Sequence, residues 1–191
     1  MDELEIICMY NSREYGKAWF NTLIDSYQNY DGFTPADFIS VDGGLRINQG
    51  HKTLFYSDNF YFLINPVSFL LHSLYWVQGR DSGIWDSFEQ KDLPCGIAVH
   101  MMTSPREYLI LSRKDKEYLL LSYLPSGNKV EKKRGIHYFE NEPIKESAWV
   151  EAAKVALAEY FLFFEKAMDK DRSHPGIEIM EKYLRAWQNI R

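Results

Sequence analysis

Glu107-Tyr-Leu-Ile-Leu-Ser112 and Glu117-Tyr-Leu-Leu-Leu-Ser122 nearly repeat each other ten positions apart, and the predicted fold is built around this pair. The charged segment 113–116 joins them, so the pair predicts a β-hairpin. If that segment is the connection, Ile110 pairs with Leu119. Both faces of such a hairpin are apolar, which is typical of central strands in a sheet that needs cover on each side.

The composition of the two predicted hairpin faces sets the rest of the architecture. One face would carry Leu109, Leu111, Tyr118 and Leu120, and the other Tyr108, Ile110, Leu119, Leu121 and Tyr123. Apolar periodicity predicts amphipathic helices over 12–28, 66–78 and 146–168. We expect the 146–168 helix on one face and the 12–28 or 66–78 helix on the other. The predicted fold is a single α+β domain, residues 1–191, built on a mostly antiparallel sheet around the 107–122 hairpin and packed by amphipathic helices.

The remaining elements follow from turn residues and local periodicity. Strands are expected at 4–10, 37–41, 45–48, 53–55, 59–64, 97–102 and 136–139, with a turn at Asp42-Gly43-Gly44 and a polar break at 140–143. A last helix is expected after residue 176. In the 146–168 helix the apolar stripe is so broad that Glu151, Lys154 and Glu165 are the residues expected to face water.

Length and cysteine content place broad limits on the class of protein. The chain has 191 residues, a net charge of −5 and two cysteines without CxxC spacing. A core of useful size is therefore possible without disulfides, and a reducing cytoplasm is the expected location. The acidic N-terminus does not resemble a secretory signal, and Asn65-Pro66 interrupts the most apolar stretch, 61–77, so no membrane segment is predicted.

Charge is unevenly distributed along the chain. Residues 18–45 contain no Lys or Arg, and their aspartates alternate with aromatic residues. A second acidic stretch with Trp85 follows at 79–92. Acidic surfaces with aromatic anchors suit a basic protein partner, although the same residues also suit core packing and turn capping. The candidate partner contacts are Asp31, Asp37, Asp42, Asp81, Trp85, Asp86 and Glu89.

Catalytic motifs are weak. Cys95 could act as a nucleophile with His100 or His137 as its base, but a small buried residue is the more ordinary role at a strand start. Carboxylate pairs such as Glu140 with Glu142, or Asp81 with Asp86, are expected by chance among 27 acidic residues. The five histidines lack zinc spacing, and no glycine pattern indicates a phosphate cradle, so no metal or other cofactor is predicted. His72, in an apolar helix, is expected to be a satisfied core or boundary residue.

A basic run follows the hairpin. Lys129, Lys132, Lys133 and Arg134 could contact nucleic acid, with Tyr118 and Tyr123 available for stacking. A charged edge that prevents strand-to-strand association explains the same residues, and both tyrosines also fit core roles.

The layout of residues 108–164 resembles small bacterial immunity proteins that neutralise toxins. The shared features are the double-sided hairpin, a strand ending near Phe139, the polar 140–143 break and the 149–164 amphipathic helix. The resemblance implies a cytosolic, non-catalytic inhibitor that binds a cognate toxin domain, often a basic nuclease, and masks its active site. A small hydrolase using Cys95 or a carboxylate pair, and a nucleic-acid-associated module, are the alternatives. The sequence does not define the oligomeric state.

Overall fold

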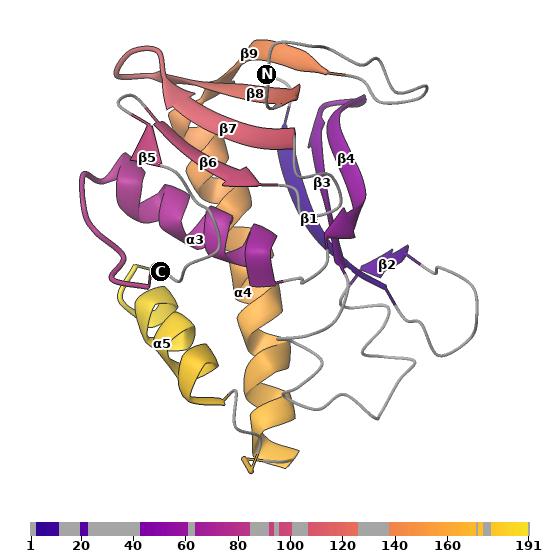
Figure 1. The fold of residues 1–191 in the computed structure, drawn as a ribbon, viewed down its shortest axis with the longest axis vertical. Coiled ribbons are helices and arrows are strands. Elements are labelled where there is room, and N and C mark those ends of the chain that lie inside the picture. Colours follow the sequence, from indigo (N-terminus) through magenta and orange to yellow (C-terminus); the bar gives the residue numbers. More distant parts are fainter. Residues whose placement is uncertain are drawn as a thin grey trace.

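Among the residues that it describes, the computed structural model contains two antiparallel sheets and three helices (Figure 1). It describes residues 3–11, 20–22, 43–60, 64–84, 92–93, 96–100, 107–125, 138–170, 172–173 and 177–190. The first sheet has the order β2-β1-β3-β4 and the second the order β5-β6-β7-β8-β9. The strands are β1 (Leu4–Asn11), β2 (Phe20–Thr22), β3 (Gly43–Gln49), β4 (Lys52–Phe60), β5 (Asp92–Leu93), β6 (Gly96–His100), β7 (Glu107–Arg113), β8 (Tyr118–Pro125) and β9 (Phe139–Lys145). The helices are α3 (Ile64–Val77), α4 (Glu146–Lys170) and α5 (Ile177–Gln188). The predicted α+β class with antiparallel pairing is confirmed.

The twin runs form the β7–β8 hairpin at the centre of the second sheet, as predicted, but in a different register. Leu111 pairs with Leu121, and Arg113 with Leu119. The predicted pairing of Ile110 with Leu119 is therefore wrong, because Ile110 lies opposite Ser122. The cause is a longer turn, in which the Asp115 carboxylate accepts hydrogen bonds from the backbone N–H groups of Glu117 and Tyr118, both at 2.8 Å. The N–H of Lys114 also bonds the Tyr118 carbonyl at 3.0 Å.

This register changes which residues share a face of the hairpin. The buried face carries Leu109, Leu111, Leu119, Leu121 and Tyr123, all of which belong to the hydrophobic core. The expectation that the 66–78 helix covers the face opposite the 146–168 helix is also wrong. Figure 1 shows α3 and α4 on the same side of the second sheet, where they share one core with the buried hairpin residues. Both helices, predicted at 66–78 and 146–168, are confirmed as elements.

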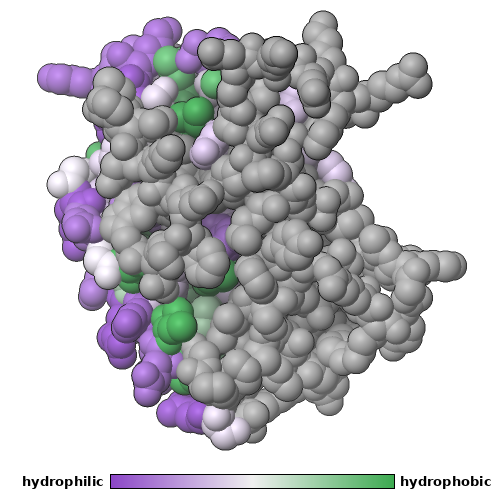
Figure 2. Space-filling model, in the orientation of Figure 1, coloured by the Kyte–Doolittle hydropathy of each residue, from purple (hydrophilic) through white to green (hydrophobic). Residues whose placement is uncertain are grey.

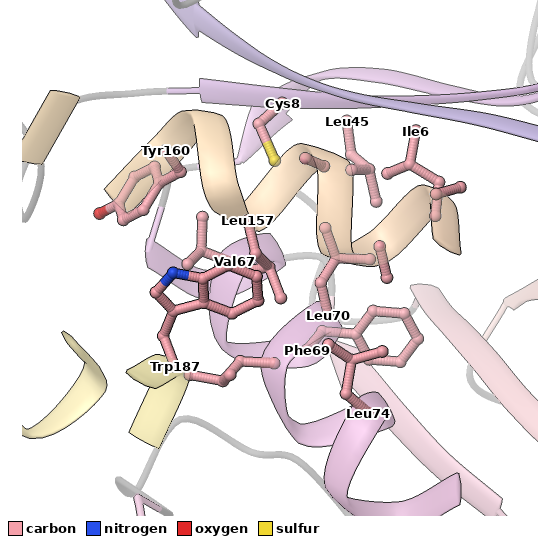
Figure 3. Packing of buried hydrophobic residues seen from close by; sticks show 14 of the residues in the cluster. Ile6, Cys8, Leu45, Val67, Phe69, Leu70, Leu74, Leu157, Tyr160 and Trp187 are labelled. Carbon is pink, nitrogen blue, oxygen red and sulfur yellow. The ribbon is translucent and has the colours of Figure 1, made fainter. Parts of the chain in front are cut away.

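Side chains from both helices and from the first sheet meet in the core. In Figure 3 Val67 and Leu70 of α3 point toward Leu157 of α4, while Cys8 and Leu45 project from the first sheet toward the same helix. The apolar stripe predicted on α4 is buried as expected. The predicted last helix is confirmed as α5, whose indole ring at Trp187 stacks on Phe161 at a centroid distance of 5.9 Å.

Side chains of the described residues join the two sheets both in the core and at the surface. The rings of Phe55 in β4 and Tyr123 in β8 meet edge to face, with centroids 5.0 Å apart. At the surface, Lys52 Nζ lies 2.9 Å from a carboxylate oxygen of Glu142 in β9. The sequence predicted one sheet, whereas the chain forms two that share a core.

Several predicted elements of the N-terminal half are wrong. Strand β2 lies inside the predicted 12–28 helix and pairs with the end of β1, so an edge of the sheet overrides the helical pattern there. The predicted turn at Gly43-Gly44 is part of β3, where both glycines are buried opposite β1. The strands predicted at 53–55 and 59–64 are one strand, β4, and residue 64 already begins α3. The predicted strand 37–41 lies outside the described residues.

The predicted polar break at 140–143 is also wrong, because these residues belong to β9. Proline is tolerated in an edge strand, where its missing N–H faces away from the ladder, and β9 is the edge of its sheet. Helix α4 then begins at Glu146, two residues after Ile144, which is buried in β9. The strands predicted at 4–10 and 97–102 are confirmed as β1 and β6.

Candidate protein-binding surface

The second face of the hairpin is a partly exposed apolar surface. We call it the outer hairpin face and define it by Tyr108, Ile110, Tyr118, Leu120 and Leu124. These side chains alternate along β7 and β8 with the buried ones, and they are not part of the described core. Tyr108 and Leu124 are direct cross-strand neighbours. Figure 2 shows hydrophobic residues at the surface near the top of the view, where Figure 1 places β7 and β8.

Exposed residues of β9 lie beside this face, and a serine lies within it. On β9, Pro143 and Lys145 lie opposite Leu120 and Tyr118 and are exposed. Ser122 lies on the face between Leu120 and Leu124 and is buried, and its hydroxyl accepts a hydrogen bond from the Asn141 backbone N–H at 2.9 Å. An apolar centre with a polar rim is the usual anatomy of a protein interface.

The hairpin tip adds charge to this rim. The Lys114 ammonium lies 5.8 Å from the centroid of the Tyr118 ring. Hydrogen bonds from the N–H groups of Glu117 and Tyr118 lower the pKa of the Asp115 carboxyl, and this carboxylate holds the turn closed. The tip therefore keeps a fixed shape beside the apolar face.

Arg113 holds the hairpin against two helices. Its guanidinium bonds the Glu146 carboxylate at 2.5 Å and the Val77 carbonyl at 3.2 Å. It also lies 5.4 Å from the centroid of the Trp76 ring. The end of β7, the end of α3 and the start of α4 are thereby tied together, so the outer hairpin face rests on a firm support.

Of the predicted partner contacts, Asp81 lies among the described residues. It is exposed in the turn after α3, where its carboxylate accepts the Gly83 N–H at 2.9 Å. This carboxylate has a local role in a turn that requires a positive φ angle of 66° at Gly83. The other predicted contacts, Asp31, Asp37, Asp42, Trp85, Asp86 and Glu89, lie outside the described residues.

The predicted catalytic cysteine cannot be placed in a site, because Cys95 and His137 lie outside the described residues. For His100 the structure describes the backbone, which lies in β6 opposite Tyr108. The described cysteine, Cys8, is buried, and burial together with the negative charge of Glu159 raises the pKa of its thiol to about 12. A thiol in that environment is protonated and unreactive at neutral pH.

The other chemical candidates have ordinary roles where they are described. Glu142 pairs with Lys52, and Glu140 is exposed two residues away on the same edge strand. His72 is buried as predicted, with Nδ1 3.0 Å from the Ser82 hydroxyl. Within the described ranges, no three His, Cys, Asp or Glu side chains come together in a way that could hold a metal ion.

The predicted nucleic-acid contacts Lys129, Lys132, Lys133 and Arg134 lie outside the described residues. Tyr123, proposed for base stacking, is instead packed in the core against Phe55. Tyr118 is partly exposed on the outer hairpin face. The two tyrosines lie on opposite faces because they are five residues apart on the same strand.

A second apolar surface lies along α4, and the sequence did not predict it. We call it the α4 ridge and define it by Val155, Ala158 and Leu162, of which Val155 is 60% and Leu162 49% exposed. The expectation that Glu151, Lys154 and Glu165 alone face water on this helix is therefore wrong. The signal in the sequence is a second set of apolar residues at spacings of three and four beside the buried stripe. A groove of about 480 Å³ runs beside the ridge and is lined by it together with Lys154, Glu165 and Trp187.

Comparison with known proteins gives no match to a family model, a curated protein or a solved structure. No described helix combines the length and apolar character needed to cross a membrane.

Proposed function

We propose that this chain is a non-catalytic binding protein that neutralises a cognate bacterial toxin by covering it. The observation that supports the proposal best is the outer hairpin face. On two central strands, this face leaves apolar and aromatic side chains partly exposed. A folded chain usually buries such side chains of central strands unless they bind a partner.

The chemistry of this face suits protein recognition. Tyrosine supplies a large contact area with few rotatable bonds, and Tyr108 and Tyr118 stand on neighbouring strands with leucine and isoleucine between them. Because β7 and β8 are internal strands and Arg113 fixes their tip, little conformational entropy is lost when a partner binds. A rigid apolar face with a polar rim can hold a protein surface without any reaction.

Charge supports the class of partner. The chain has a net charge of −5, so its field attracts a basic protein and raises the rate of encounter. The resemblance of residues 108–164 to immunity proteins agrees with a basic toxin domain as that partner. We propose that binding occurs in the cytoplasm of the producing cell, where the toxin must be masked.

Growth rescue tests this proposal. The protein encoded beside this chain is expressed as the presumed toxin, with and without the chain, and association is checked by pull-down. We expect the wild-type chain to restore growth and to be recovered with the toxin. Absence of both rescue and association would contradict the proposed function.

A matched pair of variants tests the surface. Leu120→Arg introduces a charge on the outer hairpin face, whereas Ile179→Arg introduces the same charge at a residue of α5 that is 42% exposed. We expect Leu120→Arg to lose rescue and Ile179→Arg to keep it, with circular dichroism showing that both variants are folded. Full rescue by a folded Leu120→Arg variant would exclude this face.

A further inference from the structure

The α4 ridge faces away from the core, and the opposite side of the same helix is buried in the core. The buried stripe includes Trp149, Tyr160 and Phe164, each less than 2% exposed. Val155 and Leu162, by contrast, are the most exposed large apolar residues of this helix among those whose burial the structure describes. The ridge therefore contributes nothing to the described core, and its exposure costs solubility unless something covers it.

Opposite charges stand at the two ends of the ridge. Glu151 lies one turn before Val155, and Lys166 lies one turn after Leu162. Both are exposed, and the helical repeat places them on the same face as the ridge. Along this face an acidic residue, three apolar residues and a basic residue follow one another, and Lys154 and Glu165 flank them beside the groove.

We propose that the α4 ridge binds the α4 ridge of a second copy of this chain, with the two helices antiparallel. The two-fold axis passes between Ala158 and Glu159. Val155 then lies level with Leu162 of the second copy, and Glu151 lies level with Lys166 of the second copy. By symmetry each of these pairs forms twice, as an isologous interface requires.

The charges select this arrangement over its alternatives. Parallel helices would place Glu151 beside Glu151, and Lys166 beside Lys166, and like charges repel. An antiparallel shift by three residues would place Val155 opposite Glu165 and leave its apolar side chain without a partner. The proposed register satisfies both the apolar and the charged pairs, so the ridge is complementary to a second copy of itself.

The surface around the ridge allows close packing. Ala158 lies near the proposed axis, and a small side chain there lets two helices approach to about 8–10 Å between axes. The groove beside the ridge, with Trp187 as its α5 wall, leaves room for the flank of the second helix. The area of a single helix pair lies at the weak end of specific interfaces, so we expect a dissociation constant on the order of 10 µM.

Sedimentation equilibrium of the full chain from about 1 to 300 µM tests the dimer, because this range brackets the expected dissociation constant. The wild-type chain is expected to shift from monomer to dimer across it. Leu162→Glu removes the apolar contact, and we expect this variant to stay monomeric. Ile179→Glu, which makes the same kind of change at an exposed apolar residue of α5, serves as the control and should dimerise like the wild type.

Charge reversal tests the antiparallel register. Glu151→Lys and Lys166→Glu each create like-charge pairs, so each variant alone should dimerise at least tenfold more weakly. An equimolar mixture of the two should form a heterodimer, and the double variant E151K/K166E should recover the wild-type dimer. These residues are exposed, so the variants are expected to fold.

Several results would overturn this proposal. A wild-type chain that stays monomeric throughout the range excludes the dimer, and a dimer unaffected by Leu162→Glu uses another surface. A dimer unaffected by both charge reversals excludes the register. If the chain is monomeric and Leu162→Glu loses toxin protection, the ridge belongs to the toxin interface instead. Because the proposed toxin surface is the outer hairpin face, growth rescue and dimerisation can fail separately.

Discussion

The Trp149 indole N–H of α4 donates a hydrogen bond to the Ser73 hydroxyl of α3 at 2.8 Å, and both side chains are fully buried. The Ser73 hydroxyl in turn donates to the Leu70 carbonyl at 2.7 Å. A buried polar chain therefore runs through the contact between the two helices, beside the edge-to-face packing of Phe69 on Trp149. It fixes the relative position of helices whose contact is otherwise apolar.

Removing the Ser73 hydroxyl should be costly for its size. Ser73→Ala leaves the Trp149 N–H buried without an acceptor, which should reduce the free energy of unfolding by about 1–3 kcal/mol. Urea denaturation measures this loss. Ser112→Ala, which removes a hydroxyl from a partly exposed position in β7, is the control. Equal losses in the two variants would show that the buried hydrogen bond is unimportant.

Gly96 leaves no room for a side chain where β6 approaches β7. A Cβ atom at this position would lie 2.3 Å from the Leu111 carbonyl oxygen and 2.9 Å from the Ser112 Cα atom. Both obstacles are backbone atoms, so Gly96→Ala must displace a strand, and we expect a loss of about 2–4 kcal/mol.

A second glycine provides the comparison for Gly96. Gly79 has a φ angle of 67° with open space around its Cα atom. Asparagine tolerates this conformation, so Gly79→Asn should cost less than about 1 kcal/mol. Thermal or urea unfolding that ranks the two variants in the reverse order would contradict the β6–β7 geometry.

Alkaline pH should destabilise the chain through Cys8. The pKa of its buried thiol is raised from the ordinary 9.0 to about 12. Below pH 9 the thiol is protonated in both the folded and unfolded states, so it causes no pH dependence. Between pH 9 and about 12 the unfolded state ionises first, and stability falls by up to about 1.4 kcal/mol per pH unit from this group.

The Cys8→Ala variant isolates this effect. Burial also raises the pKa of Tyr160, so some alkaline destabilisation remains in the variant. Between pH 8.5 and 10.5 we expect the free energy of unfolding, measured in urea, to fall less in Cys8→Ala than in the wild type. If the free energy of unfolding fell equally with pH in the wild type and in Cys8→Ala, Cys8 would ionise equally in the folded and unfolded states.

Arg113 should contribute more than an ordinary surface ion pair. Arg113→Lys keeps the charge. However, a lysine ammonium cannot bond both the Glu146 carboxylate and the Val77 carbonyl while also lying over the Trp76 ring. The group is partly exposed, so we expect a loss of about 0.5–1.5 kcal/mol. Lys52→Arg, in the Lys52–Glu142 pair, is the matched control and should be neutral. A neutral Arg113→Lys variant would show that the hairpin tip is held by other contacts.

The sequence predicts the elements of this fold better than their pairing. The hairpin, α3, α4 and α5 each extend over enough periodic residues for the pattern to dominate. The hairpin register depends on one carboxylate, since Asp115 lengthens the turn by bonding two backbone N–H groups. The observed register differs from the predicted one by three residues. Because three is an odd number, Leu119 and Leu121 take the places predicted for Tyr118 and Leu120 on the buried face.

Short strands are set by neighbours that the local sequence does not reveal. Strand β2 has three residues, and its strand conformation comes from pairing with β1 within a predicted helix. The paired glycines of β3 resemble a turn but lie buried in the first sheet. The candidate surface could not be predicted for the same reason, because the outer hairpin face exists only in the observed register.

Calorimetric titration of the chain with the purified protein encoded beside it, the toxin of the proposed function, tests whether the outer hairpin face binds a partner. Tyr118→Ala on the outer hairpin face is compared with Tyr56→Ala, which removes the same side chain from β4, where it is 48% exposed. We expect Tyr118→Ala to weaken binding by at least tenfold, about 1.4 kcal/mol, and Tyr56→Ala to leave the affinity unchanged. Equal affinities of the wild type and a folded Tyr118→Ala variant would contradict it.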